Sequence, residues 1–401
     1  MNKKFFTILL FFLVLCSCAK NPQKKVFIKN NSYQIEKDKI ATNAKKISKV
    51  WFENFDFPNY KKKLKKVTWD ELPNDQKLDK NLVNLINERC LNYLHYFPQI
   101  TNTCDQLNSL ARNKEKFLDH FKKHFSPWLI KTSNQNLGKL TGYYEPIISG
   151  SLIKSDKYKY PLYGKPDDLI TVKIDQTYPE LKGKKVRGRI ENKVLIPYHT
   201  RKEIESGKLA SIKPIAWAED KVDIFFLQIQ GSGKLKLPDE RIIKLNYDAH
   251  NGHPYTSIGR ILIKEHGLSI ADVSMKKIKK WIKNNPNLGN DLMERNKSFV
   301  FFKISENSKH GPTGSIGYPL TPLRSIAIDP MKNPMGFLYF ISTEDSKYHK
   351  IQRFVFAEDT GSAIKGQIRF DFFWGSGNEN GLKAGKTNEK VKGWVILPNN
   401  R

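Results

Sequence analysis

The spacing of apolar residues changes along the chain and predicts three kinds of structure in turn. The first is an apolar run, Phe5–Leu15, which is interrupted only by Thr7 and follows Lys3 and Lys4. A stable membrane helix needs about 20 apolar residues, so this shorter run is typical of the core of a signal peptide. Residues 20–50 are polar and lack periodicity, which predicts a tether rather than a packed element.

Helical spacing follows the tether in two segments. Apolar residues recur at three- and four-residue intervals between Asn81 and Leu94, and the pattern repeats from Leu110 to Phe125. We expect two amphipathic helices here, each with its apolar face in a core.

From Leu140 onward, short apolar runs alternate with glycine and proline turn signals. Strands are expected at 194–196, 224–229, 298–304, 325–328, 337–341, 353–356, 367–373 and 391–397, and helices at 258–266 and 270–284. Short, regularly broken strands are typical of small barrels or sandwiches. The fold class expected is therefore mainly β with a helical N-terminal part.

The residues at the end of the apolar run indicate in which cellular compartment the protein resides. Leu15-Cys16-Ser17-Cys18 resembles the bacterial lipobox, in which the last cysteine is lipidated, although an ordinary secretory signal with incidental cysteines is the alternative. Ala19 resembles a Gram-negative sorting signal for the outer membrane. We expect a signal peptide at 1–17, lipidation at Cys18, a tether at 18–50, and a protein on the periplasmic face of the outer membrane.

The charge of the chain indicates what kind of partner it binds, and its cysteine content bears on disulfides and metal sites. The chain carries 69 Lys and Arg against 40 Asp and Glu, a formal net charge of +29. Such an excess favours a polyanionic partner. Export argues against nucleic acid and favours peptidoglycan with its stem-peptide carboxylates, although a lysine-rich composition alone gives the same count. Cys90 and Cys104 lack metal-ligand spacing, and both a disulfide and two buried thiols fit them.

Three aspartates in the last third of the chain are candidates for chemistry. Asp329 closes an apolar run and Asp359 opens a glycine-containing loop, so both positions also suit turn or capping residues. Asp371 instead interrupts the aromatic segment 369–377. Desolvation there would raise its pKa and keep the carboxyl protonated, as a general acid requires, although structural ion pairs also bury carboxylates.

Several longer motifs accompany these aspartates in a fixed order. They are GYYEP at 142–146, YPLY at 160–163, FFLQIQGSG at 225–233, NGHPYTSIG at 251–259, SFVFF at 298–302, DTGSAIKG at 359–366 and WGSG at 374–377. With the three aspartates, they resemble the membrane-bound lytic murein transglycosylase A family and its three-aspartate domain. The resemblance covers roughly residues 140–400.

The resemblance implies a fold and a domain plan. It implies a double-psi β-barrel catalytic domain, preceded by the helical segment, at 51–145 plus 305–401. A smaller β-rich domain is inserted at 146–304, and glycan lies in the groove between the two. The catalytic aspartate of the family matches Asp371, and Asp329 and Asp359 match the two supporting aspartates.

The activity that the resemblance implies needs one carboxyl group. A lytic transglycosylase cleaves the β-1,4 bond between N-acetylmuramic acid and N-acetylglucosamine, and the muramic C6 hydroxyl closes a 1,6-anhydro ring. Asp371 would act first as acid and then as base, without metal or cofactor, and other cell-wall enzymes are candidate partners. Substrate contacts are expected from Tyr143, Tyr144, Gln228, Gln230, Gly231, Ser232 and Gly233.

Plainer interpretations stay open for these residues. Alternating glutamines also suit the solvated face of a strand, and Gly-Ser-Gly also suits a simple turn. Two rival functions remain as well. One is a non-catalytic wall-binding lipoprotein, and the other is a water-using muramidase with Glu145 or Asp359 as its second carboxylate.

Overall fold

The computed structural model describes residues 42, 44, 46, 55–73, 80–92, 94, 100–132, 136–174, 185–269, 273–305, 311–343 and 350–399. The expected signal peptide, the lipidation site Cys18 and nearly all of the tether lie outside these residues. Within the described ranges, no helix has both the length and the apolar character that crossing a membrane requires.

A layer of helices precedes the main sheet. Its members are α2 (Phe57–Lys62), the 3-10 turn η1 (Trp69–Glu71), α3 (Lys80–Asn92), α4 (Thr101–Leu110) and α5 (Lys114–His124). The prediction of α3 is confirmed. The helix expected from Leu110 to Phe125 is present as α5, but it begins later, because Asn113 caps it by accepting a hydrogen bond from the backbone N–H of Lys116. A disulfide joins Cys90 of α3 to Cys104 of α4, which settles the alternative left open by the sequence.

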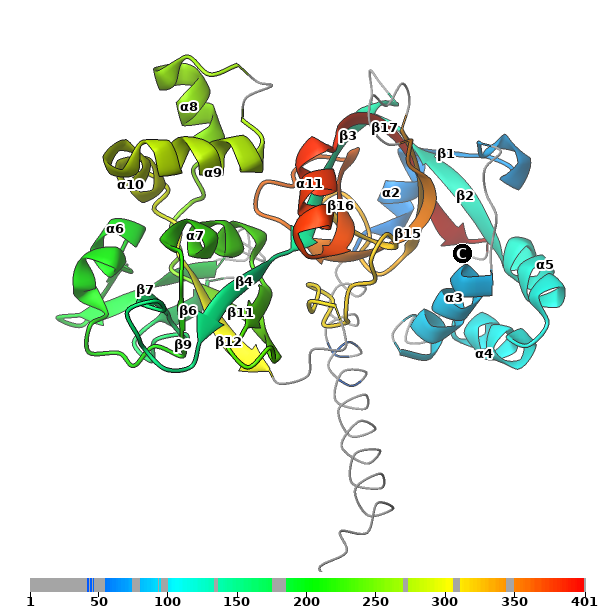
Figure 1. Ribbon diagram of the computed structural model, residues 1–401. Helices are drawn as coiled ribbons and strands as arrows, with labels where there is room; N and C mark the ends of the chain where they lie inside the picture. Colours follow the sequence, from blue (N-terminus) through cyan, green and yellow to red (C-terminus); the bar gives the residue numbers. More distant parts are fainter. Residues whose placement is uncertain are drawn as a thin grey trace, which may run out of the picture.

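Six strands close into a barrel at the centre of the molecule (Figure 1). They are β3 (Gly138–Glu145), β13 (Ser325–Ile328), β14 (Leu338–Thr343), β15 (Gln352–Thr360), β16 (Arg369–Ser376) and β17 (Asn388–Pro398). Their order is β17-β14-β15-β13-β16-β3, and β3 pairs back with β17. The pairs β13–β15 and β16–β3 are parallel, and the others are antiparallel.

The helical layer is fastened to this barrel. Strands β1 (Leu64–Lys66) and β2 (Phe125–Ile130) continue the sheet beyond β17. Every residue of β13 and β14 is buried, as in sheets that are covered on both faces. Beneath α3, the Nε of Arg89 lies 3.0 Å from Oε1 of Glu358, and both side chains are almost completely buried. This ion pair joins helix α3 to strand β15 of the barrel.

A second domain, here called the insert, lies beside the barrel and is made of the elements from β4 to β12 (Figure 1). Its larger sheet has the order β12-β11-β10-β4-β9-β5, and its smaller sheet has the order β6-β7-β8. The strands are β4 (Ile147–Ser151), β5 (Tyr160–Leu162), β6 (Ile170–Lys173), β7 (Lys185–Glu191), β8 (Val194–Pro197), β9 (Ala216–Ala218), β10 (Gly233–Lys236), β11 (Ile242–His250) and β12 (Val300–Ser305).

The insert also contains helices, which makes the protein mixed α/β rather than mainly β. They are α6 (Arg201–Glu203), the π-helical turn η4 (Ile204–Lys208), α7 (Lys221–Gln230), α8 (Ile258–His266), α9 (Met275–Asn284) and α10 (Pro286–Glu294). Helix α11 (Asn378–Lys386) packs on β3 and β16 of the barrel. The sequence missed α10 and α11, although α8 has the predicted bounds.

The strand expected at 224–229 is wrong, because these residues belong to helix α7. Asp220 caps the helix by accepting a hydrogen bond of 2.8 Å from the backbone N–H of Val222, and Gly231, at φ 81°, ends it. Six consecutive or nearly consecutive side chains of α7 are buried. A helix that is covered on most sides has no polar stripe, so its apolar run is indistinguishable from that of a buried strand.

Candidate active site

The pairing of the barrel strands places two of the three candidate aspartates in one row of side chains. Asp359 of β15 and Asp371 of β16 both pair with Ala327 of β13, and Asp371 pairs on its other side with Thr141 of β3. Side chains at paired positions share a face of the sheet, within about 5 Å between neighbouring strands. Because both aspartates pair with Ala327, their carboxylates lie on the same face of the sheet, on either side of its small side chain.

A β-bulge decides which acidic residue joins that row. The register between β13 and β15 shifts after Ile326, so Ala327 pairs with Asp359 and not with Glu358. Bulges re-aim side chains in this way, often beside active sites. Glu358 consequently points into the core toward Arg89, and Asp359 points to the face that carries Asp371.

Asp371 is partly exposed and has one direct protein partner among the described residues. The hydroxyl of Thr141 donates to its Oδ1 at 2.5 Å, and Arg369 donates to that hydroxyl at 2.9 Å. Burial raises the pKa of Asp371 to about 6, against the opposing effects of the Thr141 hydrogen bond and the Arg369 charge. Nearby Asp359 raises this pKa further. The carboxyl can thus be protonated at a pH where ordinary aspartates are ionised.

Hydrogen bonds from Ser315 and Tyr143 hold Asp359 in place. The backbone N–H and the hydroxyl of Ser315 reach its Oδ1 at 3.1 and 2.8 Å, and the hydroxyl of Tyr143 reaches its Oδ2 at 3.1 Å. Burial raises the pKa of Asp359, and these hydrogen bonds oppose the rise. Burial and the charges of Asp359 and Asp371 raise the pKa of Tyr143, so its phenol keeps its proton.

Asp329 does not join the other two aspartates. Its side chain is buried, and its two oxygens accept hydrogen bonds from the backbone N–H groups of Met331 and Gly366, at 3.2 and 2.9 Å. These contacts tie the end of β13 to the loop between β15 and β16.

The remaining residues of the predicted site divide between the domain junction and the core. Gln230 accepts a hydrogen bond of 3.2 Å from the backbone N–H of Tyr144, whose ring is buried and whose hydroxyl reaches Met275 of α9. The turn from Gly231 through Ser232 to Gly233 leads into β10, and a Cβ on Gly233 would come within 2.8 Å of the carbonyl oxygen of Pro146. Gln228 is buried and donates to the carbonyl of Val300.

Sequence reasoning missed the partners of Glu145. Its Oε2 forms an ion pair with Nζ of Lys234 in the insert, at 3.1 Å, and accepts a hydrogen bond of 2.5 Å from the hydroxyl of Ser376 in β16. Glu145 follows Thr141 by four residues on the same strand, roughly 13 Å along it. The carboxylate thus links the insert to the barrel, four residues along β3 from the position that pairs with Asp371.

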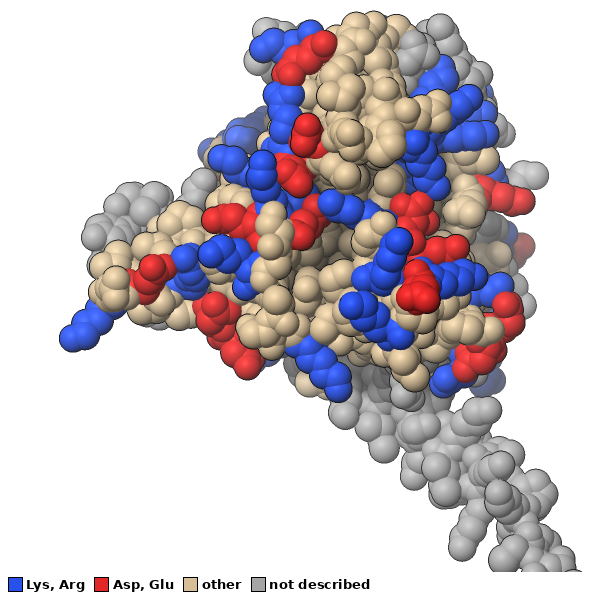
Figure 2. Space-filling model, turned by 60° about the vertical axis from the view of Figure 1, so that its left-hand side comes forward, with Lys and Arg blue, Asp and Glu red and all other residues tan. Residues whose placement is uncertain are grey.

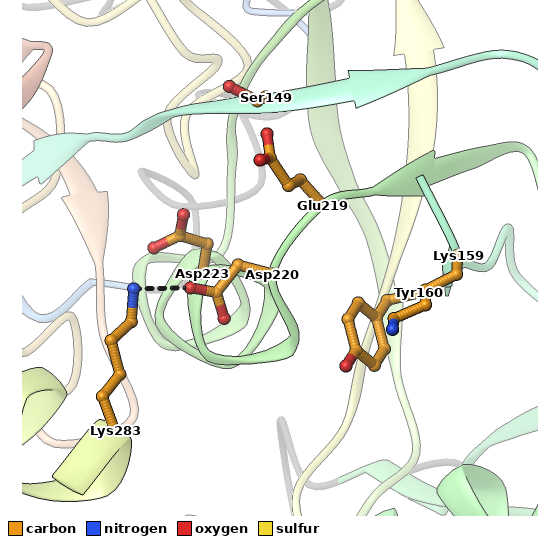
Figure 3. Close-up of a pocket in the computed structure, with 7 residues that line it drawn as sticks. All are labelled: Ser149, Lys159, Tyr160, Glu219, Asp220, Asp223 and Lys283. Atoms are coloured by element: carbon orange, nitrogen blue, oxygen red, sulfur yellow. Dashed lines mark ion pairs between the residues drawn. The ribbon is translucent and has the colours of Figure 1, made fainter. Parts of the chain in front are cut away.

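The insert carries a separate depression of about 550 Å³ at the N-terminal end of α7 (Figure 3). Its lining residues are Ser149, Lys159, Tyr160, Glu219, Asp220, Asp223 and Lys283. Lys283 and Asp220 form an ion pair of 2.9 Å across it. Acidic and basic side chains are mixed over the face of the molecule that Figure 2 shows. None of the lining residues belongs to the barrel strands that carry the aspartates.

No group of three His, Cys, Asp or Glu side chains in the described part of the chain is arranged to hold a metal ion. His250, just before the motif at 251–259, and His253 within it both contact other residues of the insert. His250 contacts Arg187 at 2.6 Å, and His253 contacts the backbone carbonyl of Tyr198 at 2.7 Å.

Comparison with known families and proteins agrees with this architecture. Residues 139–303 match the model of the MltA specific insert domain, and residues 324–397 match that of the 3D domain. The chain is 32% identical over 266 residues to the membrane-bound lytic murein transglycosylase A homolog of Buchnera aphidicola, and 30% identical to the Escherichia coli (strain K12) enzyme of that name. These matches span 64% of this chain and just under two thirds of each relative, 66% and 65%.

Solved structures extend the likeness over more of the chain. MltA from Neisseria gonorrhoeae, in its monoclinic form, has a TM-score of 0.73 and 32% identity, with 84% of this chain and 93% of that one covered. The membrane-bound lytic murein transglycosylase of Agrobacterium tumefaciens has a TM-score of 0.70 and 27% identity, with coverage of 84% and 98%. E. coli MltA with bound chitohexaose shares the fold at a TM-score of 0.65 and 24% identity, with coverage of 84% and 94%.

Proposed function

The chain belongs to the membrane-bound lytic murein transglycosylase A family, and we propose that it cleaves peptidoglycan glycan strands without water. The bond broken is the β-1,4 link between N-acetylmuramic acid and N-acetylglucosamine, and the product ends in 1,6-anhydromuramic acid. One observation carries the proposal for this chain. Asp371 is a partly exposed carboxyl whose pKa of about 6 lets it act both as an acid and as a base.

The first step is protonation of the leaving group. Neutral Asp371 gives its proton to the bridging oxygen as the bond to the muramic C1 breaks. Positive charge develops at C1, and the N-acetyl group of the same sugar stabilises it. The reaction leaves Asp371 ionised beside the sugar that it has just released.

The second step closes the ring. Ionised Asp371 takes the proton from the muramic C6 hydroxyl, and the C6 oxygen bonds to C1, which restores the neutral carboxyl. The nucleophile is part of the substrate, so it requires no bound water and little ordering. Atoms balance without a cofactor, and the single carboxyl returns to its starting state.

The contacts of the two other carboxylates argue against a water-using muramidase. Glu145 is neutralised by Lys234 and held by Ser376 at the domain junction. Asp359 accepts hydrogen bonds from Ser315 and Tyr143, which leaves it poorly placed to activate water. A supporting role for Asp359 fits better, because its charge raises the pKa of Asp371 and thereby favours the protonated acid.

The glycan would lie between the barrel and the insert. The family relationship supports a double-psi barrel, with domains at 51–145 plus 305–401 and at 146–304. Tyr143, Gln230 and the turn Gly231–Gly233 remain proposed substrate contacts, because they lie on or beside the junction. The open space around Gly231, which a Cβ would not fill, suits close approach of a sugar. For Tyr144 and Gln228, burial favours a supporting role instead.

A lipid anchor on Cys18 would hold the enzyme at the periplasmic face of the outer membrane, and the relatives are likewise named membrane-bound. Fractionation of Cys18→Ala tests this part of the proposal. The variant should leave the membrane fraction or stay unprocessed, whereas unchanged outer-membrane fractionation would overturn the anchor.

Digestion of purified sacculi in ¹⁸O-labelled water tests the reaction itself. A lytic transglycosylase yields anhydro ends without ¹⁸O, whereas a muramidase yields reducing ends that carry one ¹⁸O atom. A wall-binding protein releases neither product while it still sediments with sacculi. Mass spectrometry of the soluble fragments therefore separates the proposed function from both rivals in one experiment.

A further inference from the structure

Three side chains form a directed chain of hydrogen bonds that ends on the proposed acid. One guanidinium nitrogen of Arg369, Nη2, donates to Oγ1 of Thr141 at 2.9 Å. Oγ1 in turn donates to Oδ1 of Asp371 at 2.5 Å. The other terminal nitrogen of Arg369, Nη1, donates to the backbone carbonyl of Phe370 at 2.5 Å, which fixes the guanidinium in place.

The chemistry of these groups gives the chain one direction. A guanidinium only donates hydrogen bonds, whereas a hydroxyl has one hydrogen and two lone pairs. Arg369 takes one lone pair of the Thr141 oxygen, and the single hydroxyl hydrogen is directed at Asp371. Oδ1 of Asp371 is thereby an acceptor, and a proton on that oxygen would point at the hydrogen of the hydroxyl.

We propose that Arg369 and Thr141 are positioning residues that force the acidic proton of Asp371 onto Oδ2. The inference rests on the proposed function and adds to it the oxygen that performs the chemistry. Oδ2 accepts no hydrogen bond from the described residues. The same oxygen then gives the proton to the glycosidic bond and takes the next one from the C6 hydroxyl, without rotation of the carboxyl group.

The other groups around Asp371 do not compete for this oxygen. Ala327, which pairs with Asp371 from β13, has no polar side chain. Tyr143 of β3 donates to Oδ2 of Asp359, so its hydroxyl hydrogen is already used. The charged groups that act on Asp371 are Arg369 on its own strand and Asp359 of β15, and among the described residues only Thr141 donates a hydrogen bond to its carboxylate.

Thr141→Val and Thr141→Ser are the paired variants that test the proposal. Valine keeps the shape and the β-branch but has no hydroxyl, whereas serine keeps the hydroxyl. We expect kcat to fall by about tenfold or more in Thr141→Val, the effect of one hydrogen bond to a charged group, and Thr141→Ser to recover most of it. The fall should appear in kcat, with KM little changed, because ground-state contacts to the glycan persist.

The pH dependence provides a readout that a purely structural role would not move. Loss of the Thr141 hydrogen bond, or of the Arg369 charge in Arg369→Met, raises the pKa of Asp371, so the alkaline limb of kcat/KM shifts to higher pH. Thr171→Val is the matched control, because Thr171 is exposed on β6 of the insert. That variant should keep the wild-type kcat and pH profile.

The pKa of Asp371 can also be measured without substrate, by following the resonance of its ¹³C-labelled carboxyl group by NMR as the pH is changed. This makes the test independent of turnover. The Asp371 resonance, assigned by its absence from Asp371→Asn, should titrate at higher pH in Thr141→Val and close to wild type in Thr141→Ser. Folded Thr141→Val with unchanged titration and kcat would overturn the proposal, as would a Thr141→Ser variant as impaired as valine. If wild-type protein gives no anhydro product, the proposed function fails, while the titration still decides the hydrogen-bond chain.

Discussion

Asp371→Asn is expected to make the protein more stable at neutral pH, because the acid is held in a setting that disfavours its charge. The amide keeps the shape of the carboxyl and still accepts the hydrogen bond from Thr141. It never ionises, so the cost of a charge in a desolvated position disappears. A residue kept for catalysis rather than for folding commonly shows this behaviour.

The magnitude follows from the difference between the folded and unfolded pKa of Asp371. Burial raises the pKa from 3.8 to about 6, so the folded state binds more protons than the unfolded state between these values. Stability from this group is complete below pH 3.8 and is lost as the pH rises to about 6. A shift of about two units corresponds to roughly 3 kcal/mol, an upper bound because the side chain is partly exposed to solvent.

Urea unfolding of both proteins at several pH values provides the measurement. Asp371→Asn should exceed wild type by ~1–3 kcal/mol at about pH 7.5, and the gap should close toward pH 4. Asp167→Asn, at an exposed position of the insert, is the control and should differ from wild type by under about 0.5 kcal/mol. A destabilised Asp371→Asn whose deficit does not change with pH would refute the desolvation of the carboxyl.

Three further predictions concern pH and stability. In wild type, kcat/KM should fall as the pH rises through about 6, because the protonated fraction of Asp371 falls; a profile that still climbs at about pH 8 would contradict this. Arg89→Met should lower the free energy of unfolding in urea by ~3–5 kcal/mol, because it leaves Glu358 charged and buried. Adding Glu358→Leu should restore much of this stability, whereas a cost below about 1 kcal/mol for Arg89→Met would contradict a buried ion pair. Replacing Cys90 and Cys104 together by serine should cost about 3 kcal/mol, since the bond closes a loop with a sequence separation of 14, and an unchanged midpoint under oxidising conditions would contradict this.

The sequence predicted five of the six barrel strands, all but β3, because their turn residues and apolar runs are local signals. The strand at Ser325–Ile328 and the helix at Ile258–His266 have the predicted bounds. Helix α7 could not be recognised in the same way. Its burial is a tertiary property, and a continuous apolar run has the same appearance in a covered helix as in a covered strand.

The candidate site was predictable in its residue types but not in its partners. The aromatic surroundings of Asp371 pointed to a raised pKa, and the structure has that pKa raised. The contacts from Thr141 and Ser315 depend on strand register and on residues far away in the chain, for which a single sequence carries no signal. The bulge that separates Glu358 from Asp359 is likewise invisible until β13 and β15 are paired.

The central claim is that Asp371 alone performs the acid and base steps, and one comparison of products tests it most directly. Asp371→Asn, Asp359→Asn and Asp329→Asn, each shown to be folded by thermal melting, would digest the same sacculi, with anhydromuropeptides counted by mass spectrometry. We predict that Asp371→Asn loses product formation by at least ~10²-fold while it still binds sacculi, and that the other two retain partial activity or lose stability. An active Asp371→Asn beside a folded but inactive Asp359→Asn would contradict the claim and move the acid to Asp359.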